Sequence, residues 1–138
     1  MTTREDSSRE AELFNRIDNA IDSFKKSAGT NKKIKVSKKP HNDWIDFKWR
    51  QLTWLDNGIE YLIEIYANHD SEQKLIGWNL YTAVYYDHNK KRYYSSKTFA
   101  ENKPLEFIAD HSELLIHECY AFISMIKKEE IPFAVNLK

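Results

Sequence analysis

The sequence predicts an α+β fold, in which an N-terminal helix is followed by a four-stranded antiparallel meander and a C-terminal helix packed on the sheet. Apolar residues recur every three or four positions near both ends of the chain, which is the period of an amphipathic helix. Between these segments the period falls to two, and aromatic and β-branched residues dominate, as is typical of strands. A chain of 138 residues with 41% hydrophobic residues has the size of one domain, so we expect residues 1–138 to form a single α+β domain.

The first helix is expected between Ser7 and about Ser27. Its apolar positions fall on one helical face and are Leu13, Ile17, Ala20, Ile21 and Phe24. Ser7 and Glu10 have the spacing of a capping box, which favours a helix start at this point.

Four strands are expected after this helix, in sequence order, at about 44–56, 59–67, 74–86 and 91–98. Asn57 and Gly58 tolerate the positive φ of a tight hairpin turn, which predicts that they join the first two strands. Residues 1–6 and 29–43 show neither period and are expected to be flexible, with Ile34–Val36 as a candidate edge strand.

The apolar phase slips within the first of these strands. Phe47 and Trp49 occupy odd positions, whereas Leu52 and Trp54 occupy even ones. Because side chains alternate between the two faces of a sheet, an unbroken strand would send one of these pairs to the wrong face. We therefore expect a β-bulge near residues 50–51.

Two start sites are open for the C-terminal helix. Pro104 suits a first helical turn, whereas Asp110 and Glu113 have the spacing of a capping box further along. The later start, just before Leu114, is preferred. The helix then carries an apolar stripe of Leu115, Cys119, Phe122, Ile123 and Ile126. Together, the helix and strand faces predict one core that contains Ile17, Ile21, Ile63, Ile65, Leu80, Val84, Phe122 and Ile123.

No residue pattern predicts a catalytic, cofactor or metal site. The glycines, at positions 29, 58 and 77, lack the spacing of a phosphate-binding loop. His111 and His117 are six residues apart on the expected helix and point in different directions, so they do not suggest a metal site. Glu60 and Glu64 share one strand face, which has the composition of an ordinary exposed sheet face. We therefore expect no catalytic residue, no cofactor and no metal ion.

The cysteine content and the charge indicate where the protein acts. Cys119 is the single cysteine, which excludes an intramolecular disulfide and suggests a reducing compartment, so a cytoplasmic location is expected. No stretch approaches the ~20 apolar residues of a membrane-spanning helix, so no membrane association is expected. The 21 basic and 21 acidic residues give a formal net charge of zero, which argues against strong global attraction to nucleic acid.

The second hairpin is the most informative segment for function, because tyrosines flank a basic turn. The register counted from the turn places Tyr85 opposite Arg92. It also places Ala83 opposite Tyr94. Side-chain alternation then brings one group together on a single sheet face, namely Tyr81, Tyr85, Arg92 and Tyr94. The same side chains could instead be cross-strand packing residues that a helix or the C-terminal tail covers.

The leading hypothesis is a non-catalytic protein-binding module, such as an inhibitor or an immunity-type protein that occludes a macromolecular partner. Tyrosine and arginine are favoured anchors of such interfaces. The alternative is a single-stranded nucleic-acid-binding protein that stacks bases on the aromatic and basic sheet face. Its nucleic-acid or anion contacts would come from Lys32, Lys33, Lys35, Lys38, Lys39, Lys90 and Lys91. An enzyme with an unrecognised site is a third option, and the oligomeric state stays open.

Overall fold

A computed structural model describes residues 4–28, 34–37, 49–56, 59–87 and 92–126 of the chain. In chain order the elements are α1 (Arg4–Ala28), β1 (Lys35–Ser37), β2 (Trp49–Asp56), β3 (Ile59–His69), β4 (Leu75–Asp87), β5 (Arg92–Lys103), α2 (Leu105–Asp110) and α3 (Ser112–Ser124). The fold class is α+β, with an N-terminal helix, an antiparallel sheet and C-terminal helices packed on it, as the sequence predicts. The sheet has five strands rather than four, because the candidate edge strand forms as β1.

The strands form one antiparallel meander, in which each strand pairs with its neighbours in the sequence. Asp56 pairs with Ile59, so a two-residue connection joins β2 to β3 at the predicted place. The turn residues themselves, Asn57 and Gly58, lie outside the described residues. The parts of the expected flexible segment at 29–33 and 38–43 also lie outside them.

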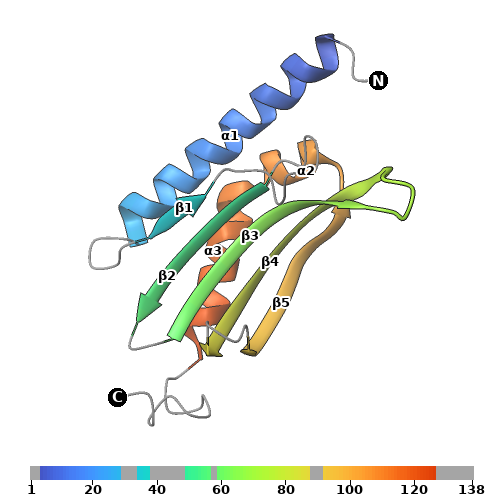
Figure 1. Cartoon of the computed structure of the whole chain (residues 1–138). Coiled ribbons are helices and arrows are strands. Elements are labelled where there is room, and N and C mark those ends of the chain that lie inside the picture. Colours follow the sequence, from blue (N-terminus) through green and yellow to red (C-terminus); the bar gives the residue numbers. More distant parts are fainter. Residues whose placement is uncertain (1–3, 29–33, 38–48, 57–58, 88–91, 127–138) are drawn as a thin grey trace.

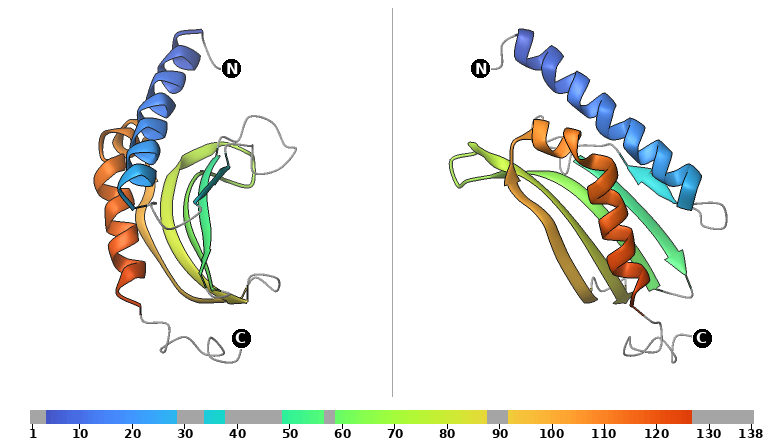
Figure 2. Two further views of the ribbon diagram at one scale, coloured as in Figure 1. Left: turned by 90° about the vertical axis from the view of Figure 1, so that its left-hand side faces the viewer. Right: turned by 180° about the vertical axis from the view of Figure 1, so that it is seen from behind.

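All three helices cover the same face of the sheet, as Figures 1 and 2 show. The strands bend so that their ends curve away from the helices (Figure 2, left). We call the face without helices the concave face, and along β3 it carries Glu60, Leu62, Glu64 and Tyr66. No helix within the described ranges combines the length and the apolar character that a bilayer crossing demands.

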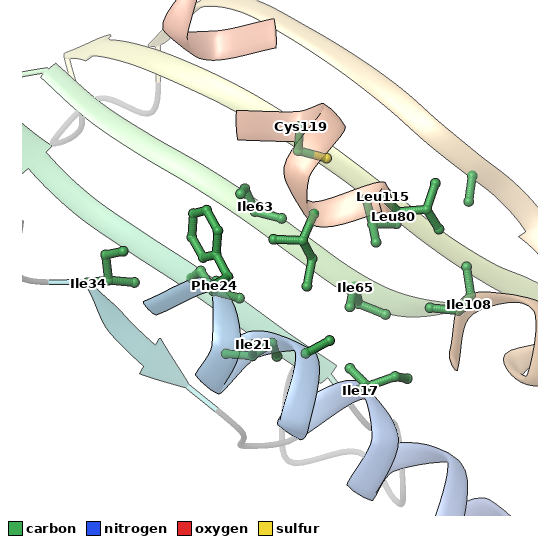
Figure 3. Packing of buried hydrophobic residues seen from close by; sticks show 14 of the residues in the cluster. Ile17, Ile21, Phe24, Ile34, Ile63, Ile65, Leu80, Ile108, Leu115 and Cys119 are labelled. Carbon is green, nitrogen blue, oxygen red and sulfur yellow. The ribbon is translucent and has the colours of Figure 1, made fainter. Parts of the chain in front are cut away.

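The hydrophobic core lies between the helices and the sheet. Ile17, Ile21 and Phe24 of α1 point toward the strands (Figure 3). Leu115 and Cys119 of α3 belong to the same buried cluster. The predicted core is confirmed, because seven of its residues are buried in one cluster: Ile17, Ile21, Ile63, Ile65, Leu80, Val84 and Ile123. The eighth, Phe122, is half-buried and packs against that cluster.

The predicted bulge in β2 is wrong. The strand pairs with β3 without a register shift from Trp49, opposite Tyr66, to Asp56. The apolar phase slips for a different reason: Arg50 occupies the core-facing position and is nearly buried there, with its guanidinium 2.7 Å from a carboxylate oxygen of Asp18. Trp49 therefore lies on the concave face. Residues 44–48, where the strand was expected to begin, lie outside the described part.

The preferred start of the C-terminal helix is only partly right. A first helix, α2, begins directly after Pro104, because Leu105 and Ile108 form an apolar face of their own and are buried. A second helix, α3, begins at Ser112, but the expected capping box is not formed, since His111 is the N-cap residue and makes no side-chain capping bond. At the other end of the chain, α1 begins at Arg4, upstream of Ser7.

Strands β4 and β5 approach unusually closely near the end of β5. A Cβ atom on Gly77 would lie 2.5 Å from the carbonyl carbon of Asn102, so only glycine fits this position without displacing the chain. Asn102 has a positive φ of 53°, a conformation that asparagine tolerates better than most residues. Its backbone N–H donates to Oδ1 of Asn79 at 2.7 Å, which replaces a ladder bond where the register shifts.

Candidate functional site on the concave sheet face

The structure brings two of the four predicted partner-binding residues together. Tyr81 and Tyr85 both lie half-buried on the concave face of β4. Their partners across β3 are carboxylates, because Tyr81 pairs with Glu64 and Tyr85 pairs with Glu60. Each of these two tyrosines thus lies opposite an acidic residue of the neighbouring strand.

The pairing expected across the second hairpin is wrong. Tyr85 pairs with Tyr93 instead of Arg92, and Ala83 pairs with Ser96 instead of Tyr94. The register shifts on both sides of Tyr85, so a count from the turn misplaces the residues of β5.

The other predicted contacts do not pair with the two tyrosines, or they lie outside the described residues. Arg92 is the first residue of β5 and pairs with Asp87. Tyr94 lies within the register irregularity and is 36% exposed. Lys35 is exposed on β1. The remaining predicted lysines lie outside the described residues, and they are Lys32, Lys33, Lys38, Lys39, Lys90 and Lys91.

A buried carboxylate organises the centre of the concave face. Glu64 is 7% exposed, and its Oε2 accepts hydrogen bonds from the indole Nε1 of Trp49 and from Nε2 of Gln51, the latter at 2.9 Å. The Tyr81 hydroxyl is also hydrogen-bonded to Glu64. Burial and the neighbouring Glu64 charge raise the pKa of Tyr81 far above its ordinary value, so the hydroxyl stays protonated and acts as the donor.

A second set of hydrogen bonds extends this cluster toward β5. The ring of Tyr66 meets the ring of Tyr81 edge to face, with centroids 5.8 Å apart. The Tyr66 hydroxyl accepts a hydrogen bond from Nδ2 of Asn79 at 2.9 Å. Since Asn79 also accepts from the backbone of Asn102, the polar cluster runs continuously from β2 to β5. Such a satisfied network holds its aromatic rings in fixed positions.

Side chains at the centre of the concave face are buried, whereas Leu55 near its margin is exposed. Leu62 and Ala83 are 3% and 1% exposed, whereas Leu55 of β2 is 60% exposed on the same face. Glu64 is likewise buried, so the sequence-based interpretation of Glu60 and Glu64 as an ordinary exposed face is wrong for Glu64. The two-residue hairpin places Gln51 opposite Glu64 when β2 is unbroken, but the bulge expected near residues 50–51 would have shifted this pairing.

The polar groups at the centre of the concave face are hydrogen-bonded to one another. Glu64 accepts hydrogen bonds from Trp49, Gln51 and Tyr81, and the Tyr81 hydroxyl retains its proton. In the part of the chain that the structure describes, no group of three or more His, Cys, Asp or Glu residues could hold a metal ion. Comparisons of the chain with protein-family models, with curated proteins and with solved structures found no match.

Proposed function

We propose that this protein is a non-catalytic protein-binding module of the inhibitor or immunity type, which occludes a partner through the concave face of its sheet. The observation that carries the proposal is the register of β3 and β4, which sets Tyr81 beside Glu64 and Tyr85 beside Glu60. Tyrosine is a favoured interface anchor, and the half-buried Glu60 carboxylate next to Tyr85 favours basic residues on the partner. The partner is therefore a protein that presents a convex, basic surface.

The fixed geometry of the tyrosines supports an interface role. Tyr66 and Tyr81 contact each other edge to face, and the hydroxyl of each has a hydrogen-bond partner. Rings that are already held in place lose little conformational freedom on binding, so more of the interaction free energy contributes to affinity.

The same carboxylates weigh against single-stranded nucleic acid. A base stacked on Tyr85 would bring its phosphate close to Glu60, and like charges repel at that range. Nucleic-acid grooves that follow a phosphate backbone carry positive charge instead. Binding of nucleic acid is therefore the result that the test below contrasts with binding of a protein. The buried single cysteine, Cys119, supports the proposal that the module works in the reducing cytoplasm.

The test compares matched variants in affinity capture from a nuclease-treated lysate of the native host. Tyr85→Ala removes one anchor, and Glu60→Lys reverses one charge on the same face. Glu113→Lys makes the same charge change on the exposed side of α3 and serves as the control. We expect a captured protein whose affinity falls by about 5- to 30-fold with either concave-face variant, the equivalent of about 1–2 kcal/mol, and stays unchanged in the control.

A fluorescent dT20 oligonucleotide provides the second arm of this test. Because phosphates are attracted by positive charge, Glu60→Lys should strengthen nucleic-acid binding while it weakens binding to a basic protein. Capture that survives both concave-face variants, or oligonucleotide binding that Tyr85→Ala abolishes, would overturn the proposal. Thermal melting followed by circular dichroism verifies that each variant is folded.

A further inference from the structure

A hollow of about 360 Å³ lies on the helix side of the sheet, away from the concave face. It forms where the first turns of α1 meet the start of β4, the end of β5 and the beginning of α2. Four segments that are far apart in the sequence thus contribute to its walls. Its size is within the range of small-molecule sites in proteins.

The inner wall of the hollow is apolar and rigid. Leu13, Trp78 and Leu105 line it and are at most 9% exposed. The Trp78 ring packs edge to face against Phe14, with centroids 5.3 Å apart, which fixes the indole in place. An apolar ligand group would therefore meet a preformed surface there.

The outer wall carries apolar side chains that the fold itself leaves exposed. Leu75 and Ile76 line the hollow and are 54% and 50% exposed. These two large aliphatic residues, with about half of their surface in water, offer apolar contact area to a ligand in the hollow. Gly77 continues this wall at the point where its backbone lies close to that of Asn102.

Charged residues complete the lining. Arg9 and Lys103 contribute two positive charges and Glu10 contributes one negative charge. The Arg9 guanidinium lies 3.0 Å from a carboxylate oxygen of Glu106 and 3.6 Å from one of Glu12. All three side chains are about half exposed or more, and exposed ion pairs of this kind are weak. The Lys103 ammonium lies 5.2 Å from the ring centroid of Phe107. A ligand anion can compete for both cations.

We propose that this hollow binds a small amphipathic anion, with its apolar body against Trp78 and Ile76 and its anionic group between Arg9 and Lys103. A medium-chain carboxylate has this chemistry. The apolar wall supplies the hydrophobic part of the affinity, and the two cations select an anion over a neutral molecule of the same shape. None of the residues that line the hollow belongs to the tyrosine and glutamate pairs of the concave face. This proposal is therefore independent of the function proposed for that face.

The test is a titration of the full chain with sodium octanoate, followed by two-dimensional amide NMR. We expect saturable shifts of the amide signals of Gly77 and Leu105 and of the Trp78 indole, and no shift of Tyr81. Octan-1-ol has the same chain without the charge and should bind at least about tenfold more weakly, which is the value of one charge-assisted hydrogen bond.

Two surface variants and one control make the result decisive. Lys103→Gln removes a cation and Ile76→Glu places a negative charge in the apolar wall, so each should weaken octanoate binding by about tenfold or more. Leu55→Glu makes the same kind of change at an exposed residue of the concave face and should have no effect. Equal binding of octan-1-ol, shifts centred on the concave face, or affinities that neither variant changes would each overturn the proposal.

Discussion

Single buried polar residues hold the concave face together. Glu64 accepts hydrogen bonds from Trp49, Gln51 and Tyr81, and in this way one carboxylate connects β2, β3 and β4. An ionised carboxylate offers two oxygens and only acceptor sites, so it can satisfy all of these donors together. The rings of Trp49 and Tyr81 are consequently positioned by the same group.

We expect Glu64→Gln to lower the free energy of unfolding by about 1–3 kcal/mol, because the amide NH₂ group cannot accept the hydrogen bonds that a carboxylate oxygen accepts. The control is Glu60→Gln. Glu60 lies four residues before Glu64 on the same face of β3 and is half-buried, so its substitution should change stability by less than about 0.5 kcal/mol. Urea titration measures both. Equal effects of the two substitutions would show that Glu64 has no special role in the cluster.

Ion pairs join the helices to one another and to the sheet, and the stability that each contributes depends on how deeply it is buried. Helix α1 forms two ion pairs that allow a direct comparison. The Asp18–Arg50 pair connects α1 to β2, and its side chains are 20% and 11% exposed. The Arg16–Asp110 pair connects α1 to α2, and its side chains are 40% and 44% exposed. The Arg50 guanidinium also lies 4.4 Å from the ring centroid of Phe14, so it is enclosed on several sides.

Asp18→Ala should therefore destabilise the protein by about 2–4 kcal/mol, because it leaves the nearly buried Arg50 charge without its carboxylate. Arg16→Ala, which breaks the exposed pair on the same helix, should cost less than about 1 kcal/mol. The double variant Asp18→Leu/Arg50→Met should recover part of the loss, since it removes both charges. Thermal and urea unfolding of the four proteins provide the comparison, and a larger effect for Arg16→Ala would contradict it.

At the scale of the whole molecule, one core couples the three helices to the sheet. Ile63 is fully buried at the centre of the sheet, and Cys119 of α3 is fully buried in the same cluster (Figure 3). Burial also raises the pKa of the Cys119 thiol, and only the thiolate is a good nucleophile. Chemical labelling of Cys119 therefore requires that the core opens.

Ile63→Ala should cost about 2–5 kcal/mol in urea titration. If Cys119 is exposed by global unfolding, the same substitution should speed its labelling by Ellman's reagent by at least about 30-fold, the factor that corresponds to 2 kcal/mol. Leu55→Ala, at a residue that is 60% exposed, is the control and should alter neither measurement appreciably. Fast labelling of the unaltered protein would show that α3 separates from the sheet without global unfolding.

Local patterns were sufficient for most of the fold. The apolar face of α1 and the hairpin between Asp56 and Ile59 follow from periodicity and turn chemistry. Both are properties of a few neighbouring residues, so they can be recognised without knowing the rest of the chain. The candidate site was predicted less well. Tyr81 and Tyr85 share a face as expected, but the pairing of Arg92 and Tyr94 was missed because the register of β5 shifts.

The remaining features depend on contacts between distant segments. The side chain of Arg50 points into the core because Asp18, 32 residues away, neutralises it there, and Trp49 is thereby directed to the opposite face. Glu64 is buried because Gln51 and Trp49 reach it from the neighbouring strand. Side-chain alternation along a strand is encoded locally, but which face becomes buried and which residues meet across it are decided by long-range pairing. That pairing exists only in the folded sheet.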